Sequence, residues 1–296
     1  MHRHFVTLDV FTNRRFAGNP LAVVLDAAGL DPVAMQAIAR EFNHPETVFV
    51  FVPADSVHRA RLRIFTPAAE LPFAGHPTVG TAVLLGLRDG VAAGCEFVLE
   101  EGIGGVRCTL ESKGDGRGGA RFRLPQLPAE TGEAPDIATT ASALGMATTD
   151  IGFGKFLPSR WSAGMSIAFV PVVGLDAIAD CRPDPSKLVA AFGRSPVYLF
   201  CDQTVEPGHA FHARMFAPGL GIPEDPATGA AAAAFAGLLV ARGGPADGDH
   251  ALVIEQGYEM GRPSLIRLAM VMQAGKLVSA SIGGDAVIMT EGTIEA

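Results

Sequence analysis

Two segments rich in small residues constrain what this chain can fold into more than any other feature. One is PFAGHPTVGTAVLL, residues 72–85, and the other is EDPATGAAAAAFAGLL, residues 224–239. In each, a short turn containing Gly and Pro is followed at once by small and apolar residues. A helix that is apolar all round is normally buried, and its small side chains let a layer of strands close around it. The chain is therefore expected to contain two buried helices.

Short runs of β-branched, aromatic and other apolar residues outnumber the helical segments. They are residues 47–52, 60–65, 120–124, 197–201, 209–216, 251–254, 265–271 and 286–290. Several alternate between polar and apolar side chains, which is typical of half-buried antiparallel strands. The segment 113–119 is rich in glycine and is expected to be a loop between strands.

The helical signals are fewer and are marked by their ends. Asp31 followed by Pro32 predicts a helix start, because Asp caps a helix N-terminus and Pro suits the first helical position. Residues 137–144 and 186–192 predict two shorter helices, each closed by a glycine. We therefore expect an α+β protein of two similar domains, each a curved, mostly antiparallel sheet wrapped around a central helix.

The two small-residue segments lie in opposite halves of the chain, which suggests that the halves are related. The first domain is expected to span residues 1–125 and the second residues 126–283. The Pro- and Glu-rich segment 126–135 is the candidate linker between them.

The composition favours small-molecule chemistry. The net charge is −8, with 23 basic and 31 acidic residues, which argues against nucleic acid or an anionic membrane as a partner. No stretch approaches the roughly 20 apolar residues of a membrane span, and the N-terminus does not resemble a secretion signal. We expect a cytoplasmic protein. Its four scattered cysteines are expected to be reduced thiols, without a zinc site or a disulfide framework.

The starts of the two small-residue helices are candidate anion sites. The first backbone N–H groups of a helix have no partner within the helix, and here no bulky side chain covers them. The groups around Gly75 in the first segment, and around Thr228, Gly229 and Ala230 in the second, could hold a carboxylate and polarise a neighbouring carbonyl. If the two helices face each other, they make one two-sided site between the domains.

Three side chains are candidates for the chemistry. Glu46 sits where a turn enters an apolar strand, and such a boundary suits a group that accepts and returns a proton. His76 lies at the mouth of the first helix, where it could orient a carbonyl or relay a proton. Asp225 is its counterpart in the second half. Each also has a plain structural interpretation: Glu46 as a turn carboxylate, His76 as a buried structural group, and Asp225 as a helix cap.

Other kinds of site find no support in the sequence. Residues 102–105 lack the glycine spacing of a dinucleotide-binding turn, and neither a Walker A pattern nor a Gly-x-Ser-x-Gly elbow occurs. His209 and His212 fall on an expected strand, where positions three apart point to opposite faces, so they are a poor metal pair. We expect no metal site.

With these residues in place, the chain resembles the phenazine-biosynthesis PhzF-like family, within the wider group related to diaminopimelate epimerase. The match runs over nearly the whole length. It is carried by FAGNPLAVV at 16–24, NxxETVF at 43–49, RxFTPxxE at 63–70, GHPTVG at 75–80, EDPATG at 224–229 and EQGxxMGRPS at 255–264.

The resemblance implies two similar domains with the active site between them, often in a homodimer, and neither metal nor organic cofactor. A closing strand, residues 284–296, is implied to return to the first domain. The residue matching Glu46 is the proton-shuttling acid/base of the family, and those matching His76 and Asp225 line the site beside it. Asn19, in the first motif, is counted with Gly75 and the second helix start as a candidate substrate-binding residue.

Two alanines mark where the chain departs from its relatives. The epimerase relatives use two cysteines, whereas here Ala74 and Asp225 stand at the corresponding helix starts, which excludes a two-thiol mechanism. The phenazine-making members carry a serine where this chain has Ala230. The missing hydroxyl argues against dihydro-hydroxyanthranilate itself as the substrate.

The leading hypothesis is a cofactor-independent isomerase that acts on a small anionic substrate, a carboxylate. Glu46 would remove a proton next to a carbonyl, imine or enol and return it to another carbon. Two alternatives stay open: an epimerase of an amino-acid derivative with Glu46 and Asp225 as opposed bases, and a non-catalytic protein that binds small carboxylates.

Overall fold

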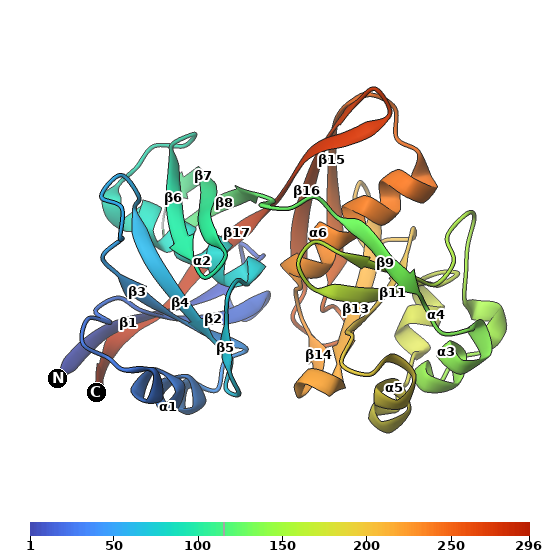
Figure 1. The fold of residues 1–296 in the computed structure, drawn as a ribbon, viewed down its shortest axis with the longest axis horizontal. Coiled ribbons are helices and arrows are strands. Elements are labelled where there is room, and N and C mark those ends of the chain that lie inside the picture. Colours follow the sequence, from blue (N-terminus) through green and yellow to red (C-terminus); the bar gives the residue numbers. More distant parts are fainter. Residues whose placement is uncertain (115) are drawn as a thin grey trace. The chain divides into compact units, whose positions relative to one another are not determined.

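The structure of the chain is a computed structural model that describes residues 1–114 and 116–296. By its internal contacts the chain divides into two compact units. Unit 1 comprises Met1–Arg123 together with Gly283–Ala296, and unit 2 comprises Leu124–Ile282. Each unit is a mostly antiparallel sheet around one central helix, so the predicted α+β class is confirmed. The units are described one at a time below (Figure 1).

Unit 1 is built on the central helix α2, Gly75–Asp89. Its other elements are β1 (His2–Val10), β2 (Asn19–Val24), α1 (Pro32–Phe42), β3 (Glu46–Phe51), β4 (Ala60–Phe65), β5 (Glu70–Leu71), β6 (Glu96–Glu101), β7 (Gly104–Gly114), β8 (Arg117–Arg123) and the second part of β17 (Lys276–Glu295). Strand β1 pairs antiparallel with both β2 and β17. Strands β6, β7 and β8 form an antiparallel meander.

Helix α2 is buried over its first twelve residues, Gly75–Gly86, and contacts β1, β2, β3, β7 and β8. Glycine is required where the strands come closest. A Cβ atom on Gly80 would lie 2.6 Å from the side chain of Leu21, and one on Gly86 would lie 2.3 Å from that of Leu110. Contacts this short do not occur between real side chains. The small residues thus let the sheet close on the helix, as the sequence predicts.

Unit 2 surrounds helix α6, Gly229–Leu238, which continues into the π-helical turn η3, Leu239–Gly243. Its other elements are β9 (Ala129–Glu133), α3 (Ile137–Leu144), η1 (Thr148–Asp150), β10 (Ser159–Ser162), β11 (Ser166–Pro171), α4 (Leu175–Asp180), α5 (Pro185–Phe192), β12 (Val197–Cys201), β13 (Phe211–Ala217), η2 (Pro218–Leu220), β14 (Ile222–Asp225), β15 (Gly248–Gln256), β16 (Ser264–Gln273) and the first part of β17. Helix α6 contacts β9, β10, β11 and β16.

Close approach again needs glycine, because a Cβ atom on Gly237 of α6 would lie 2.6 Å from the ring of Trp161 in β10. Two residues earlier in the same helix, the ring of Phe235 packs against those of Phe200 and Phe211, at centroid distances of 4.7 and 4.9 Å. These aromatic contacts fill the space that the alanines of α6 leave. The central helix and its strand layer therefore form one packed core.

The helix starts in the sequence are confirmed. Asp31 accepts a hydrogen bond from the backbone N–H of Ala34 at 2.8 Å, and Pro32 opens α1. Helices α3 and α5 match the two predicted shorter helices and end at Gly145 and Gly193.

Two local predictions were wrong. The expected linker contains β9, which pairs antiparallel with β10. All five of its side chains are exposed, so it lacks the apolar pattern of a strand and is held by backbone hydrogen bonds. The expected glycine-rich loop is mostly strand, because β7 and β8 extend into it as far as Gly114 and Arg117. Asp115, at its centre, lies outside the described residues.

The same loop anchor occurs once in each unit. In unit 1, the carboxylate of Glu100 accepts the backbone N–H groups of Ala54 and Asp55, each at 2.8 Å, and lies 2.9 Å from Nδ1 of His58. In unit 2, Glu255 makes the corresponding contacts with Val205, Glu206 and His209, all at 2.8 Å. A carboxylate with several donors is held strongly in its ionised form, so each anchor ties a loop to a strand. The anchors support an internal duplication.

The anchor in unit 2 also corrects the prediction about the histidine pair. Nδ1 of His209 and Nδ1 of His212 both lie 2.8 Å from the carboxylate of Glu255, so the two rings meet at one group. The reason is that β13 begins at Phe211. His209 precedes the strand, and the alternation of faces does not apply to it.

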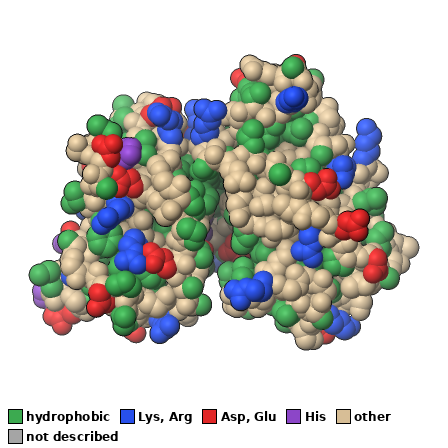
Figure 2. Space-filling model, in the orientation of Figure 1, with side chains coloured by type: hydrophobic (Ala, Val, Ile, Leu, Met, Phe, Trp, Pro, Cys, Tyr) green, Lys and Arg blue, Asp and Glu red, His purple; other side chains and the backbone are tan. Residues whose placement is uncertain are grey.

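On the face drawn in Figure 2, basic and acidic side chains are interspersed over the surface of each unit. Among the helices that the structure describes, none is both long and apolar enough to cross a membrane.

The buried His212 gives unit 2 a pH-dependent stability. Burial lowers the pKa of His212, but hydrogen bonds to Glu255 and Glu259 outweigh it and raise that pKa to about 9. The folded-state pKa lies above the ordinary value, so the contribution is complete below about pH 6.5 and is lost as the pH rises through about 9. The pKa of Glu255 is lowered to about 2 although burial acts against it, so its contribution is present above about pH 4.5 and is lost as the pH falls toward 2.

We expect His212→Leu to lower the free energy of unfolding of unit 2 by about 3 kcal/mol at pH 6, because it leaves the buried carboxylate of Glu255, and the more exposed one of Glu259, short of a partner. At pH 10 the loss should be smaller, since His212 is then neutral in the native protein. The chain's single tryptophan, Trp161, lies in unit 2, so urea denaturation followed by its fluorescence reports on this unit. His2→Leu, at an exposed histidine, is the control. An equal loss at both pH values would show that His212 carries no charge.

Candidate functional site

Glu46 is the first residue of β3 and lies where the strand enters the core of unit 1. The three residues after it are buried, and its own side chain is 13% exposed. The preceding helix α1 ends at Asn43, which adopts the left-handed conformation, and its N–H bonds to the carbonyl of Ala39. This tight cap lets the chain turn at once into β3, so the carboxylate is held at the N-terminal end of that strand.

His76 is the second residue of α2 and is 5% exposed. Its Nε2 lies 3.3 Å from Oε2 of Glu46. The structure therefore brings together two of the predicted residues. Glu46 comes from the start of β3, and His76 comes from the start of the central helix.

The protonation of His76 follows from its surroundings. Burial lowers its pKa to about 3, against a smaller opposing effect of a hydrogen bond to the backbone of Pro20. Proline has no N–H, so its carbonyl accepts and the imidazole must donate. Nε2 faces Glu46, which assigns the donated proton to Nδ1. His76 is thus neutral, and its Nε2 is an acceptor that the acid form of Glu46 can face.

Asn19 and Gly75 belong to the same part of unit 1. Asn19 opens β2 and is fully buried. Strand β2 runs parallel to β3 with Leu21 opposite Glu46, so Asn19 lies two residues before that position. Gly75 is the first residue of α2, and the N-cap residue Ala74 makes no side-chain capping hydrogen bond. Because the third residue, Pro77, has no N–H, the donors at the start of this helix are those of Gly75 and His76.

In unit 2 the predicted residues gather at the start of α6. Asp225 ends β14, and Thr228 is the N-cap of the helix. The hydroxyl of Thr228 donates to Oδ2 of Asp225. Asp225 is therefore not the N-cap residue, and its carboxylate is fixed by the threonine that follows it.

Gln256, the last residue of β15, organises this helix start and was missed as a candidate. Its Oε1 accepts the N–H of Thr228 at 3.1 Å, and its Nε2 donates to the carbonyl of Asp225 at 2.7 Å and to Oγ1 of Thr228 at 3.0 Å. Its side chain is fully buried. The signal in the sequence was its place in the EQG motif. No role could be given to that motif without knowing that β15 ends beside the N-cap residue of α6.

The same contact corrects the expected anion site of unit 2. The N–H of Thr228 is bound by Gln256 and is not available to a ligand. Gly229 and Ala230, the first two residues of α6, keep the amide positions that remain at this helix start. Whether the two helix starts form one two-sided site stays a prediction.

An Arg–Glu pair leads into each helix start. In unit 1, Nε and Nη2 of Arg63 donate to the two oxygens of Glu70, both at 2.7 Å. In unit 2, Arg214 makes the same bidentate contact with Glu224, at 2.8 and 3.0 Å. Such paired hydrogen bonds fix orientation as well as position, so each pair holds the turn before the helix.

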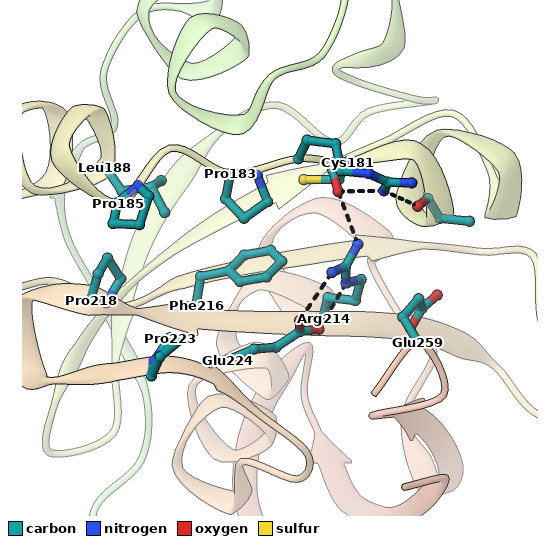
Figure 3. Close-up of a pocket in the computed structure, with 12 residues that line it drawn as sticks. Cys181, Pro183, Pro185, Leu188, Arg214, Phe216, Pro218, Pro223, Glu224 and Glu259 are labelled. Atoms are coloured by element: carbon teal, nitrogen blue, oxygen red, sulfur yellow. Dashed lines mark hydrogen bonds and ion pairs between the residues drawn. The ribbon is translucent and has the colours of Figure 1, made fainter. Parts of the chain in front are cut away.

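Arg214 and Glu224 also line a cavity of about 610 Å³ within unit 2 (Figure 3). Nη1 of Arg214 donates to the carbonyls of Ile178 and Cys181, so the guanidinium is held by four oxygen atoms of three protein groups. None of the predicted catalytic or substrate-binding residues lines this cavity. Glu224 faces the cavity, whereas its neighbour Asp225 is bound to the helix start.

Comparison with known proteins identifies the family of the chain. The family model described as phenazine biosynthesis-like protein matches residues 8–292. A Mesorhizobium japonicum protein named as an uncharacterized isomerase is 50% identical, over 99% of this chain and 98% of its own length. The trans-2,3-dihydro-3-hydroxyanthranilate isomerase of Pseudomonas fluorescens is 34% identical over 99% of both chains.

A solved structure shows the same fold. The crystal structure of the Bacillus anthracis phenazine biosynthesis protein of the PhzF family superposes with a TM-score of 0.90, at 26% identity and over 100% of both chains. The chain belongs to the PhzF family of phenazine biosynthesis-like proteins and is an enzyme of the isomerase class.

Proposed function

We propose that this isomerase moves a proton between two carbons of a small anionic substrate, with Glu46 as the acid/base and without a cofactor. The observation that carries the proposal is the placement of the Glu46 carboxyl group 3.3 Å from Nε2 of a buried, neutral His76 at a helix start. The carboxyl group that would carry the proton thus lies beside a neutral acceptor, the imidazole of His76, at the positive end of a helix.

In the proposed reaction, Glu46 alone takes up and returns the transferred proton. As a carboxylate, Glu46 takes a proton from a carbon next to a carbonyl, imine or enol, and the electron pair of the broken C–H bond delocalises into that group. The carboxylic acid then returns the proton to another carbon, and the double bond moves. No electron is gained or lost, so the step needs no redox partner.

His76 holds the acid during the transfer. Its Nδ1 proton is committed to the carbonyl of Pro20, so its Nε2 is an acceptor that orients the acid form of Glu46. Because the imidazole stays neutral, it adds no charge to the site, and the carboxyl group remains the proton carrier.

The starts of α2 and α6 are proposed to bind the substrate. The N–H groups of Gly75 and His76, and those of Gly229 and Ala230, are suited to a carboxylate and to the charge that develops on an enolate oxygen. Asp225 is proposed to position the substrate. Its carboxylate is already oriented by the Thr228 hydroxyl.

The name of the Pseudomonas fluorescens relative supports a ring-shaped, unsaturated carboxylate as the substrate class. The phenazine-making members carry a serine at the position of Ala230. We therefore propose a substrate that needs no hydrogen bond from a hydroxyl at this position. A cytoplasmic location and a homodimer are carried over from the sequence analysis as parts of this proposal.

Replacing Glu46 tests the proton transfer directly. We expect Glu46→Gln to lower substrate-dependent incorporation of solvent deuterium by about 10²- to 10⁴-fold, the usual effect of losing a general acid/base. Proton NMR in D₂O on the ring carboxylates converted by the native enzyme measures the exchange. Glu41→Gln, five residues away on α1 and exposed, is the matched control. Exchange at the native rate in the Glu46 variant would sink the assignment.

Asp225→Asn separates a positioning role from that of a second base. If Asp225 positions the substrate, losing its charge should lower kcat/KM by about 10- to 100-fold, the size of one charge-assisted hydrogen bond. The product and the site of deuterium should not change. A variant that still exchanges the substrate proton but no longer forms product of inverted configuration would instead indicate an epimerase with two opposed bases.

The protonation of His76 has its own test. The folded-state pKa of about 3 lies below the ordinary value of 6.5, so His76 should stay neutral while exposed histidines become charged. Its burial should therefore weaken the fold as the pH falls below about 6.5. We expect the ring ¹⁵N shifts of His76 to stay constant from pH 8 to pH 4. A transition of His76 near pH 6.5 would contradict the neutral acceptor.

A further inference from the structure

A second buried carboxyl group stands behind the start of α2. Glu101 is the last residue of β6 and is 8% exposed. Its Oε1 lies 2.7 Å from Oγ1 of Thr78, and its Oε2 has no hydrogen-bond partner among the residues that the structure describes. An ionised carboxylate with a single donor is costly to bury. The surroundings therefore favour the neutral acid.

The hydrogen bonds of Thr78 also favour the neutral form of Glu101. Oγ1 of Thr78 lies 2.8 Å from the carbonyl of Ala74 and 2.7 Å from Glu101, but a hydroxyl has one hydrogen to donate. The carbonyl of Ala74 can only accept. If Glu101 carries a proton and donates it to Oγ1, both contacts are hydrogen bonds. If Glu101 is ionised, both neighbours of the hydroxyl are acceptors and one contact is lost.

We propose that Glu101, as a neutral carboxylic acid, is a positioning residue for the first turn of α2. It donates to the Thr78 hydroxyl, which in turn donates to the carbonyl of Ala74, the N-cap residue. This relay fixes the turn that carries Gly75 and His76. The inference rests on the proposed function only in that this turn belongs to the site.

Unit 2 contains a related chain of hydrogen bonds, with an amide in place of the acid, although its threonine is the N-cap residue and donates to a carboxylate. Glu100 and Glu255 are the equivalent loop anchors, so the residues that follow them, Glu101 and Gln256, correspond. Nε2 of Gln256 can only donate, and it lies 3.0 Å from Oγ1 of Thr228, whose hydroxyl donates to Asp225. In both units a donor on the strand feeds a threonine hydroxyl at the helix start. A carboxyl group can donate as the Gln256 amide does only when it carries a proton.

The groups around Glu101 leave its charge uncompensated. Desolvation raises the pKa of Glu101 to about 8, and the hydrogen bond that the ionised form would accept from Thr78 only partly opposes it. Cys108 on β7 is an uncharged thiol, because burial raises its pKa, and His76 on α2 is neutral. Glu100, on β6 itself, is ionised but held by the loop residues 54, 55 and 58.

The relay therefore fails at alkaline pH. Above about pH 8, Glu101 ionises and accepts the hydrogen bond of the Thr78 hydroxyl. The carbonyl of Ala74 then keeps only its bond from the backbone N–H of Thr78, at 3.2 Å. Because the folded-state pKa is raised, ionisation in the unfolded chain is favoured from about pH 4.5 upward, and the native fold loses stability between about pH 4.5 and 8.

Three variants test the proposal. Glu101→Gln keeps a donor and removes the charge, as in unit 2. Glu101→Leu removes the donor. Glu96→Gln, at an exposed carboxylate on the same strand, is the matched control. The first readout needs no substrate: the backbone amide signal of His76 in ¹⁵N-histidine-labelled protein, from pH 6 to pH 10. We expect it to shift with a midpoint near pH 8 in the native protein and in the control, and to stay constant in Glu101→Gln.

The second readout is the solvent-deuterium exchange rate. At pH 9 the native rate should fall about 10-fold from its value at pH 7, since about a tenth of Glu101 is then protonated. Glu101→Gln should stay within about twofold of the native rate at pH 7 and lose the alkaline decline. Glu101→Leu should be slower at pH 7.

The His76 amide decides the proposal by itself. An amide that does not change between pH 6 and pH 10 in the native protein, or one that titrates equally in Glu101→Gln, would overturn it. This holds even if Glu101→Leu does not fold. If the amide responds as expected but no substrate is exchanged, the relay stands and the proposed function fails.

Discussion

The close approach of strands to the two central helices is the constraint on which the rest of the structure depends. Gly80 of α2 leaves no room for a Cβ atom beside Leu21, and Gly237 of α6 leaves none beside Trp161. Because each helix is enclosed by its sheet, its first turn is held in a fixed place relative to the strand edges. That is how a carboxylate on β3 comes to face a histidine on α2.

The two units share their supporting parts and differ at the proposed site. Both contain a carboxylate that anchors a loop, an Arg–Glu pair before the helix, and a threonine at the helix start. What surrounds the threonine has diverged, with an acid in unit 1 and an amide in unit 2. The scaffold is shared, but the two helix starts have become unequal. The proposed proton transfer uses only the first of them.

Much of the fold could be predicted because burial leaves a clear pattern in the sequence. The two small-residue helices and the Asp31 cap were identified, as were the runs that form β3, β4, β8, β12, β13, β15, β16 and part of β17, whereas strands such as β7 and β10 were not predicted. Strand β9 was not, because its five exposed side chains carry no apolar pattern and its place is set by backbone pairing with β10. The orientation of His209 and His212 was also missed, since it depends on the residue at which β13 begins.

By itself, the sequence determined the fold class and the choice of Glu46, His76 and Asp225 as candidates, because apolar periodicity and short motifs are local properties. Only the tertiary structure decided which groups meet. It placed His76 beside Glu46, gave the amide of Thr228 to Gln256, and set the carboxyl of Glu101 behind the start of α2. These contacts join residues that are distant in the chain, and the buried surroundings that fix their protonation exist only when the strands have closed around the helix.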